Sequence, residues 1–345
     1  MHLSRIIGLG LAASISFVAA AFAENVTLRY SSWLPAAHHV NQNAMYPWFQ
    51  EIEKVTEGRV KVEILPKVVG TAQSQFDVIR DGLADVSFIV PGYTPGRFPV
   101  AEIGELPFLG DDTRVLAPAF NRMYRKHMAG LNEFAGVEVM SIYSNGPGHV
   151  FTRSRPVKSV NDFNGLKLRA TGPVTTDLLN MVGVVPILKA SNEAFEMLST
   201  GVIDGSLSQS ETLKNMKMVD LMKFGTLIPG GIYHATLAVI VNSDTWGRIS
   251  PQDQQAINAV SHEKLAEAMG LTFYNADADG IETMKATPTL ALETASPDFI
   301  EGLRKALLPL DEHWIQIAKE KGLADPAAVL AELRSEVAAA EQQAE

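Results

Sequence analysis

The segments FDVIRDGLADVSF (residues 76–88) and FEMLSTGVIDGSL (residues 195–207) repeat one pattern without a gap. Each begins as the end of an apolar-faced helix, passes through a glycine (Gly82 or Gly201), and continues into an aspartate and a short strand-like run. Glycine is favoured directly after a helix because it adopts the left-handed conformation without strain. Both segments therefore predict a helix that hands over directly to a strand.

The sequence upstream of each copy extends the repeat. The first copy follows a predicted strand at 28–31, a helix after Pro47 and a strand at 60–64, and the second follows a strand at 166–169, a helix after Pro173 and a strand at 184–188. Each half therefore reads β-α-β-α-β, the unit that builds a parallel sheet. We predict an α/β protein of two similar lobes, with a small-ligand site in the crevice between them.

The first 23 residues have the pattern of a secretory signal peptide. A basic start containing Arg5 precedes an apolar run at 6–20 and a small-residue cleavage site at 21–23. The run is too short to span a membrane, so we expect a soluble mature chain from Glu24. The chain has no cysteine, and so neither disulfides nor a lipid-anchored cysteine. We expect it in a Gram-negative periplasm, where an outer membrane confines an untethered protein.

The net charge excludes some classes of binding partner, and the length indicates the number of domains. The net charge is −10, and removal of the signal with its one arginine makes it −11. Nucleic acids and anionic membranes require a basic surface, so neither is an expected partner. A mature chain of roughly 320 residues is long enough for two domains.

Turn residues mark where the chain crosses between lobes. The turn at 145–148 predicts the first crossing, and the apolar run at 235–242 predicts a buried strand that returns to the first lobe. We divide the chain into a signal peptide (1–23), first lobe (24–147), second lobe (148–234), return to the first lobe with the start of a spanning helix (235–270), and the remainder of that helix with C-terminal helices packed mainly on the second lobe (271–345).

The spanning helix is predicted from its start signal. Ser250 provides an N-cap, Pro251 follows at the first helical position, and apolar periodicity then continues to about Met284. One helix of more than thirty residues is expected to join both lobes. Residues 297–338 predict further amphipathic helix, and residues 341–345 a frayed tail.

We find no catalytic motif and expect no enzyme activity, cofactor or metal. The run at 275–280 resembles half of a calcium-binding loop, but Ala286 stands where a bidentate glutamate is required. His38 and His39 are adjacent, so in regular structure they point apart and chelate poorly. A polar loop is the better interpretation of that pair.

Arg169 is the strongest candidate for ligand binding. It ends the first strand of the second lobe, at the sheet edge where α/β proteins bind ligands. Thr171 lies in the turn to the next helix, whose N-terminus also favours anions. A guanidinium there can hold a carboxylate through two hydrogen bonds. The alternative, a surface salt bridge, is about equally compatible with position alone.

Aromatic and polar residues converge on the same region. Each alone is more often a core or capping residue, and only their convergence favours a binding site. The aromatic and histidine candidates at strand ends or loops are Trp33, Tyr93, Phe98, Tyr233 and His234, and the polar candidates are Gln75, Asn192 and Ser208.

The stretch PVKSVNDFNGLKLR at 156–169 resembles a signature of the extracytoplasmic solute-binding proteins of tripartite ATP-independent periplasmic (TRAP) transporters, the DctP-like family. The runs at 182–186 and 198–205 resemble its second conserved block, and TEGRV at 56–60 and LPF at 106–108 also fit. The resemblance covers nearly all of the mature chain.

This resemblance implies a two-lobed venus-flytrap protein that captures an organic anion and delivers it to a permease of two other subunits, driven by an ion gradient. It also implies that Arg169 pairs with the ligand carboxylate. Many members carry a second arginine where His149 stands in this chain, and a histidine is mostly neutral near pH 7. With the aromatic candidates, this favours a monocarboxylate with an apolar or aromatic body, either an aromatic or a hydroxy monocarboxylate, over a sialic acid or a C4-dicarboxylate.

Other functions remain open from the sequence. The protein could present its ligand to a sensor or to an ATP-driven importer, and less plausibly could be a periplasmic enzyme. In the leading interpretation, closure over the ligand hinges on the crossing segments at 144–149 and 233–235.

Overall fold

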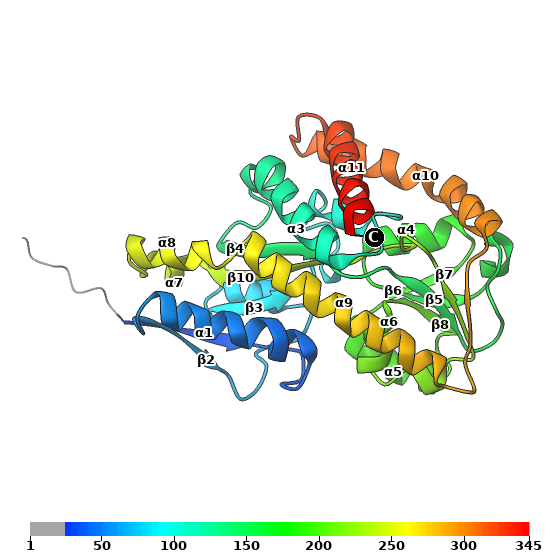
Figure 1. Ribbon diagram of the computed structural model, residues 1–345, viewed down its shortest axis with the longest axis horizontal. Helices are drawn as coiled ribbons and strands as arrows, with labels where there is room; N and C mark the ends of the chain where they lie inside the picture. The colour runs from blue at the N-terminus through cyan, green and yellow to red at the C-terminus, as the bar shows by residue number, and fades with distance from the viewer. Residues whose placement is uncertain (1–24, 345) are drawn as a thin grey trace, which may run out of the picture.

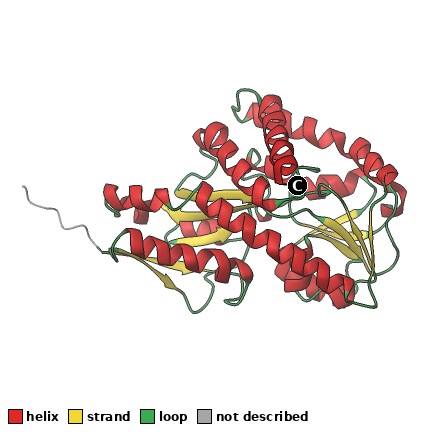
Figure 2. Ribbon diagram, viewed as in Figure 1, coloured by secondary structure: helices red, strands yellow, loops and turns green. Residues whose placement is uncertain are grey.

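The computed structural model describes residues 25–344, which form two lobes, each built on one β-sheet (Figures 1 and 2). The predicted signal peptide lies outside the described residues. The first sheet contains β1 (Val26–Ser31), β2 (Val60–Ile64), β3 (Val86–Ile89), β4 (Val137–Ser144) and β10 (Thr236–Asn242). The second contains β5 (His149–Thr152), β6 (Lys167–Ala170), β7 (Val185–Leu188), β8 (Gly205–Ser208), β9 (Phe224–Leu227) and β11 (Ala291–Thr294).

The first lobe begins with the predicted β-α-β-α-β unit. Its sheet has the order β2-β1-β3-β10-β4, with β1 parallel to β2 and β3. Strand β10 inserts antiparallel between β3 and β4, which confirms the predicted return of the apolar run at 235–242. The helices are α1 (Tyr46–Val55), α2 (Gln75–Arg80) and α3 (Thr113–Met123), joined later by α7 (Ser243–Gly247) and α8 (Pro251–Ala259).

The second lobe repeats the unit as β6, α4 (Pro173–Met181), β7, α5 (Ser191–Ser199) and β8, followed by α6 (Ser210–Asn215). Its sheet has the order β11-β9-β5-β8-β6-β7. The sequence pattern gave no prediction for β5, β9 and β11, which are only four residues long. Strand β5 pairs antiparallel with both β8 and β9, and β11 extends the sheet parallel to β9.

The repeated segment has the same structural role in each lobe. Gly82 and Gly201 adopt φ values of 70° and 76°, as expected for a left-handed residue after a helix. The aspartate of each copy then binds the first strand of its own unit. Asp85 accepts from the Arg29 backbone N–H at 2.9 Å, and Asp204 accepts from that of Lys167 at 2.8 Å. The repeat thus locks the helix–strand turn to the neighbouring parallel strand.

Two segments between the sheets run side by side. The first, 145–148, joins β4 to β5, and the second, 228–235, joins β9 to β10. They are hydrogen-bonded to each other, because the Asn145 side-chain oxygen accepts from Ala235 N at 2.8 Å and Gly148 N donates to Tyr233 O at 2.8 Å. The first connection lies at the turn for which the sequence predicts a crossing, and we call the two connections together the paired strap.

The predicted single long helix is wrong in one respect: it is broken into α8 and α9 (Glu263–Lys285). His262, at the break, has φ 55° and ψ −116°, which no helix can accommodate. The Ser261 side chain donates to Ile257 O, and Ser141 in β4 donates to His262 O, so side chains hold the interrupted backbone. The predicted start at Ser250 is confirmed, since its side chain accepts from Asp253 N.

Helix α9 nevertheless spans both lobes, as predicted (Figure 1). It packs on α3 in the first lobe and on α6 in the second. Two glycines set these contacts. A Cβ atom at Gly270 would lie 2.4 Å from Thr113 O, and one at Gly280 would lie 2.5 Å from Ser210 O. The glycines that weaken the helix pattern in the sequence therefore permit close approach to each lobe.

The C-terminal helices are α10 (Pro297–Glu320) and α11 (Pro326–Ala344). Helix α10 packs on α4, but the expectation that this part of the chain packs mainly on the second lobe does not extend to α11, which lies on α3. The predicted frayed tail is wrong, because the Glu341 carboxylate accepts from the backbone N–H groups of Asp111 and Asp112. None of the helices within residues 25–344 has the length and apolar character needed to cross a bilayer.

Candidate functional site

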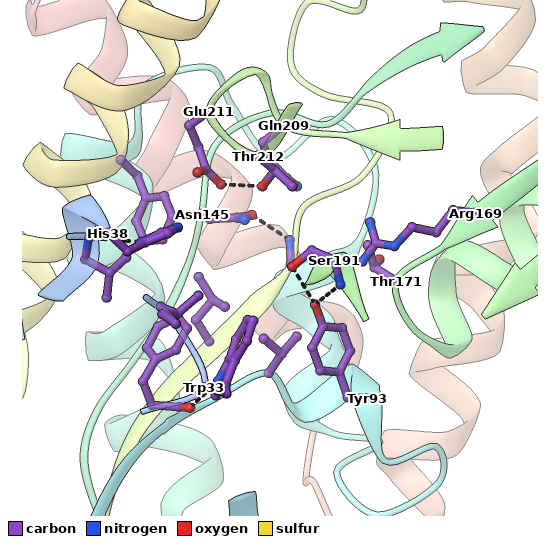
Figure 3. A pocket seen from close by; sticks show the side chains of 17 residues that line it. Trp33, His38, Tyr93, Asn145, Arg169, Thr171, Ser191, Gln209, Glu211 and Thr212 are labelled. Atoms are coloured by element: carbon purple, nitrogen blue, oxygen red, sulfur yellow. Dashed lines mark hydrogen bonds between the residues drawn. The ribbon is translucent and has the colours of Figure 1, made fainter. Parts of the chain in front are cut away.

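A cavity lies between the two sheets, at the carboxyl ends of β1, β3, β6 and β8. It offers about 50 Å³ of space to the centres of water-sized molecules (Figure 3). Residues of both lobes, of both crossing segments and of α9 line it: Trp33, Leu34, His38, Val40, Phe88, Val90, Tyr93, Asn145, Arg169, Thr171, Ser191, Gln209, Glu211, Thr212, Ala235, Leu237 and Phe273. This is the inter-lobe position that the doubled unit predicts.

Arg169 contributes a buried positive charge to the cavity. Its side chain is among the largest fully buried ones, with the residue 1 % exposed. The Nε atom donates to the Lys189 carbonyl at 2.8 Å, which fixes the plane of the guanidinium. Within residues 25–344, the Nη atoms have no hydrogen-bond partner and no carboxylate lies within 4.0 Å. A buried cation without a counter-ion is costly unless a ligand supplies the anion.

A second free donor lines the same cavity. Gln209, which follows β8, is buried, and its Nε2 atom has no hydrogen-bond partner. The amide is oriented by Tyr233, whose hydroxyl donates to the Gln209 Oε1 atom at 3.3 Å. Burying an amide donor without a partner is unfavourable, so Arg169 and Gln209 together present hydrogen-bond donors that an anionic ligand would satisfy.

Aromatic side chains from the first lobe form another part of the cavity wall. The Trp33 indole donates to Phe88 O at 2.8 Å and stacks on the Phe88 ring, with centroids 6.0 Å apart. Tyr93 meets the same indole edge to face at 6.0 Å. These contacts fix the rings in place, so that a flat apolar body can pack against them with little loss of side-chain freedom.

The lobes touch each other beside this wall. The Tyr93 hydroxyl accepts from the Ser191 backbone N–H at 3.0 Å and lies 3.4 Å from the Ser191 hydroxyl (Figure 3). Next to it, a Cβ atom at Gly172 would lie 3.0 Å from the Gly92 Cα atom. The absence of side chains at both glycines allows the backbones of the two lobes to meet.

The far side of the cavity carries a histidine–carboxylate cluster. His39 Nε2 lies 2.9 Å from Glu211 Oε2, and the imidazole rings of His38 and His39 are 4.3 Å apart. The expectation that these histidines point apart is therefore wrong. The nitrogen and oxygen atoms that His38, His39 and Glu211 offer lie within 4.8 Å of one another, a spacing that a metal ion could also occupy.

Ionisation in this cluster is set by its surroundings. Burial raises the pKa of Glu211, but the hydrogen bond and charge of His39, with smaller contributions from His38 and Thr212, bring it down to about 2. Burial and the neighbouring His39 lower the pKa of His38 to about 4. Glu211 is thus a buried anion and His38 a neutral ring at physiological pH.

Four of the residues predicted from the sequence line the cavity: Trp33, Tyr93, Arg169 and Thr171. Three others lie elsewhere. His149 accepts from Ile228 N in a separate cavity near Asp277, and burial lowers its pKa to about 3. Gln75 is buried among Ser31, Ser87 and the backbone of 69–71. Phe98 packs in the core against Phe76 and Phe134.

The remaining predicted residues are close neighbours of the cavity without lining it. Asn192 is exposed on α5, one residue after Ser191. Ser208 is buried against Ser206, one residue before Gln209. Tyr233 supports Gln209, and His234 bonds to the carbonyls of Asn145 and Gly230 in the paired strap. In these segments the predicted strand ends are right, but the side chains that face the cavity are adjacent ones.

The cavity-lining residues that were not predicted from the sequence include Asn145, Gln209, Glu211 and Phe273. Asn145 and Gln209 stand at crossing and strand-end positions that could have been selected by topology alone. Glu211 and Phe273 carry no such signal, because they meet the cavity only through the packing of α6 against α9.

Residues 30–317 match the family model described as "Bacterial extracellular solute-binding protein, family 7", or DctP. The chain belongs to the DctP family. It is a TRAP-type solute-binding protein, as the resemblance in the sequence implied. Proteins of this type work with the membrane subunits of a permease.

Individual relatives match this chain along most of their own length. A TRAP periplasmic solute-binding protein from Bordetella bronchiseptica, with bound (R)- and (S)-mandelate, is 38% identical, with a TM-score of 0.88 over 93% of this chain and 100% of that one. A marine-metagenome TRAP protein specific for aromatic acids, in complex with 3-hydroxybenzoate, is 25% identical, with a TM-score of 0.84 over 91% and 98%. The "outer membrane transporter protein TsaT" of Comamonas testosteroni is 26% identical over 87% of this chain and 89% of its own.

Proposed function

We propose that this protein captures a small aromatic monocarboxylate in the cavity between its lobes and delivers it to a TRAP permease. The observation that carries the proposal is the buried Arg169 guanidinium, which faces the cavity without a carboxylate partner in the described chain. A ligand carboxylate would accept two hydrogen bonds from its Nη atoms and a third from Gln209 Nε2. Trp33, Phe88 and Tyr93 would cover the ring.

The chemical class of ligand is supported by the similar proteins. The relative that is 38% identical contains mandelate, and the marine protein is specific for aromatic acids. Both ligands are monocarboxylates with a ring. This agrees with a cavity that has one cationic side chain and several aromatic ones.

We further propose that the protein acts in the periplasm and releases its ligand unchanged. The signal-peptide pattern of the first 23 residues and the extracytoplasmic family support the location. Closure over the ligand would bend the paired strap at 145–148 and 228–235, and exclusion of water would strengthen the ion pair. Chromatography of a ligand after prolonged incubation with the protein tests for turnover, and any product would contradict a purely binding role.

A binding screen tests the proposal directly. Protein is unfolded and refolded to remove carried-over ligand, and thermal unfolding is then followed with mandelate, benzoate, their amides, succinate and sialic acid. A ligand at a concentration 100 times its Kd stabilises the folded state by about 2.7 kcal/mol. We expect stabilisation by the two aromatic carboxylates and none by the uncharged amides. Equal stabilisation by the amides would show that no carboxylate is being recognised.

A further inference from the structure

The end of the cavity opposite Arg169 is polar as well. In Figure 3, His38 and Arg169 lie on opposite sides of the space, Glu211 is on the side of His38, and the Thr212 hydroxyl donates to Glu211. Glu211 is 3 % exposed and Thr212 is 8 % exposed. Carboxylate binding by Arg169 does not involve these residues. An unsubstituted aromatic ring in the cavity would leave the buried Glu211 anion and the His38 imidazole facing an apolar group.

The hydrogen-bonding roles at this end are defined by the surrounding protein. The Val40 backbone N–H donates to His38 Nδ1 at 3.3 Å, so the neutral ring carries its proton on Nε2 and is a donor there. Glu211 is ionised and accepts hydrogen bonds only. The cluster therefore presents one donor and one charged acceptor, and a matching ligand group must both accept and donate.

The spacing fits a single oxygen atom. One ring nitrogen of His38 and one carboxylate oxygen of Glu211 lie within 4.8 Å of each other, and both residues line the cavity. An oxygen placed between them can form hydrogen bonds of about 2.8 Å to both. We propose that this end of the cavity recognises a hydroxyl group on the ring of the ligand, remote from the carboxylate, which donates to Glu211 and accepts from His38. The inference rests on the proposed function, because Arg169 must first fix the carboxylate at the other end.

The same cluster discriminates against a second carboxylate. A carboxylate oxygen could accept from His38, but it would place a second negative charge beside the buried Glu211. Like charges brought together across a buried contact are strongly unfavourable. Glu211 is already hydrogen-bonded by the protein: its Oε2 atom lies 2.9 Å from His39 Nε2 and accepts from the Asn215 amide at 3.1 Å, and its Oε1 atom accepts from the Thr212 hydroxyl. The site is therefore built for a hydroxylated monocarboxylate and against a dicarboxylate.

A ligand series on the wild-type protein tests this inference. Calorimetric Kd values are compared for benzoate, its 3- and 4-hydroxy and 3- and 4-methoxy derivatives, and its 3- and 4-carboxy derivatives. We expect one hydroxy isomer to bind at least tenfold more tightly than benzoate, since a buried hydrogen bond to a charged group has this strength. The matching methoxy and carboxy compounds should bind more weakly than benzoate. A methoxy compound that matches its hydroxy partner would overturn the donor role of the ligand.

Two variants assign the effect to the cluster. Glu211→Gln should abolish the preference for the hydroxy compound and improve binding of the carboxy compound at least tenfold. His38→Phe should abolish the hydroxy preference without improving the carboxy compound, because His38 carries no charge to remove. Glu196→Gln, an exposed change on α5, is the matched control and should leave all Kd values unchanged.

The outcomes separate this inference from the proposed function. If both variants keep a wild-type ranking of the ring substituents, hydroxyl recognition by the cluster is wrong while carboxylate binding by Arg169 stands. If the uncharged amide of benzoate binds as well as benzoate, the proposed function itself fails. Repeating the series in EDTA tests the metal alternative, and loss of the hydroxy preference there would replace direct recognition with recognition through a bound ion.

Discussion

Substitution of Arg169 is expected to move ligand affinity and stability of the ligand-free protein in different directions. In the ligand-free protein the guanidinium is buried, holds one hydrogen bond to Lys189 O, and lacks an anionic partner within the described residues. Arg169→Met removes a buried charge that the protein itself does not neutralise. We expect its ligand-free unfolding temperature to be equal to or higher than that of the wild type, because an unpaired buried ion disfavours the folded state.

Affinity should change in the opposite sense. In the complex the same substitution leaves the ligand carboxylate buried without its cation, and such truncations cost about 2–5 kcal/mol. This corresponds to a loss of roughly 30-fold to several thousand-fold in Kd. Arg169→Lys keeps the charge but cannot bond to the Lys189 carbonyl and hold two carboxylate oxygens together, so we expect a smaller loss of about 10- to 100-fold.

Calorimetry with mandelate or benzoate measures affinity, and thermal unfolding of stripped protein measures stability. Arg155→Met, which alters an exposed arginine of the same lobe, is the control and should change neither quantity. If Arg169→Met binds within threefold of the wild type, the site assignment is wrong. If its ligand-free form is destabilised as much as its affinity falls, the residue is structural rather than a ligand contact.

Three further predictions follow from other contacts. Tyr93→Phe removes the hydroxyl that accepts from Ser191 N across the lobes, and calorimetry should show every ligand weakened about 5- to 30-fold with its ranking unchanged; an altered ranking would mean that Tyr93 selects the ligand. Gly270→Ala places a Cβ atom 2.4 Å from Thr113 O and should lower the free energy of unfolding by about 1–3 kcal/mol in a denaturant titration, whereas Gly247→Ala, with no atom within 4 Å, should be neutral. Burial, with the neighbouring charges of Glu133 and Asp177, raises the pKa of Glu102 to about 8. The folded protein therefore binds the Glu102 proton more tightly than the unfolded chain does. This contribution to stability is fully present below about pH 4.5 and is lost as pH rises through 8. Glu102→Gln should therefore raise the unfolding temperature at pH 8, by the equivalent of about 1–2 kcal/mol, and not at pH 4.5; an equal effect at both pH values would refute that assignment.

The fold was predictable where local signals and tertiary packing agree. The doubled β-α-β-α-β unit could be found from glycine stops and apolar runs, because parallel strands are buried on both faces. The break at His262 could not, since its backbone is held by Ser141 of another element rather than by any helix-breaking residue. Strands β5, β9 and β11 were not predicted for a related reason, because they are four residues long and pair with strands from distant parts of the chain.

The candidate site was predictable in position more than in composition. Strand ends locate Trp33, Arg169 and Thr171, because sheet topology brings those ends to one edge. Successive residues of a helix point in different directions, and this is why Ser191 lines the cavity at the start of α5 while Asn192 is exposed. Glu211 depends on how α9 seats against α6, which no local pattern in either helix specifies.

The two glycine contacts of α9, at Gly270 and Gly280, have a consequence for how ligand affinity can evolve. Gly270 allows α9 to pack closely on α3, and Gly280, ten residues later, allows it to pack closely on α6. If the lobes close over the ligand as proposed, the rotation would flex the helix between these two contacts, and the stiffness of the helix would oppose closure. Apparent affinity is the intrinsic affinity scaled by the fraction of molecules already able to close. Substitutions on the solvent side of α9 can therefore tune uptake at a given ligand concentration while every residue that touches the ligand stays the same.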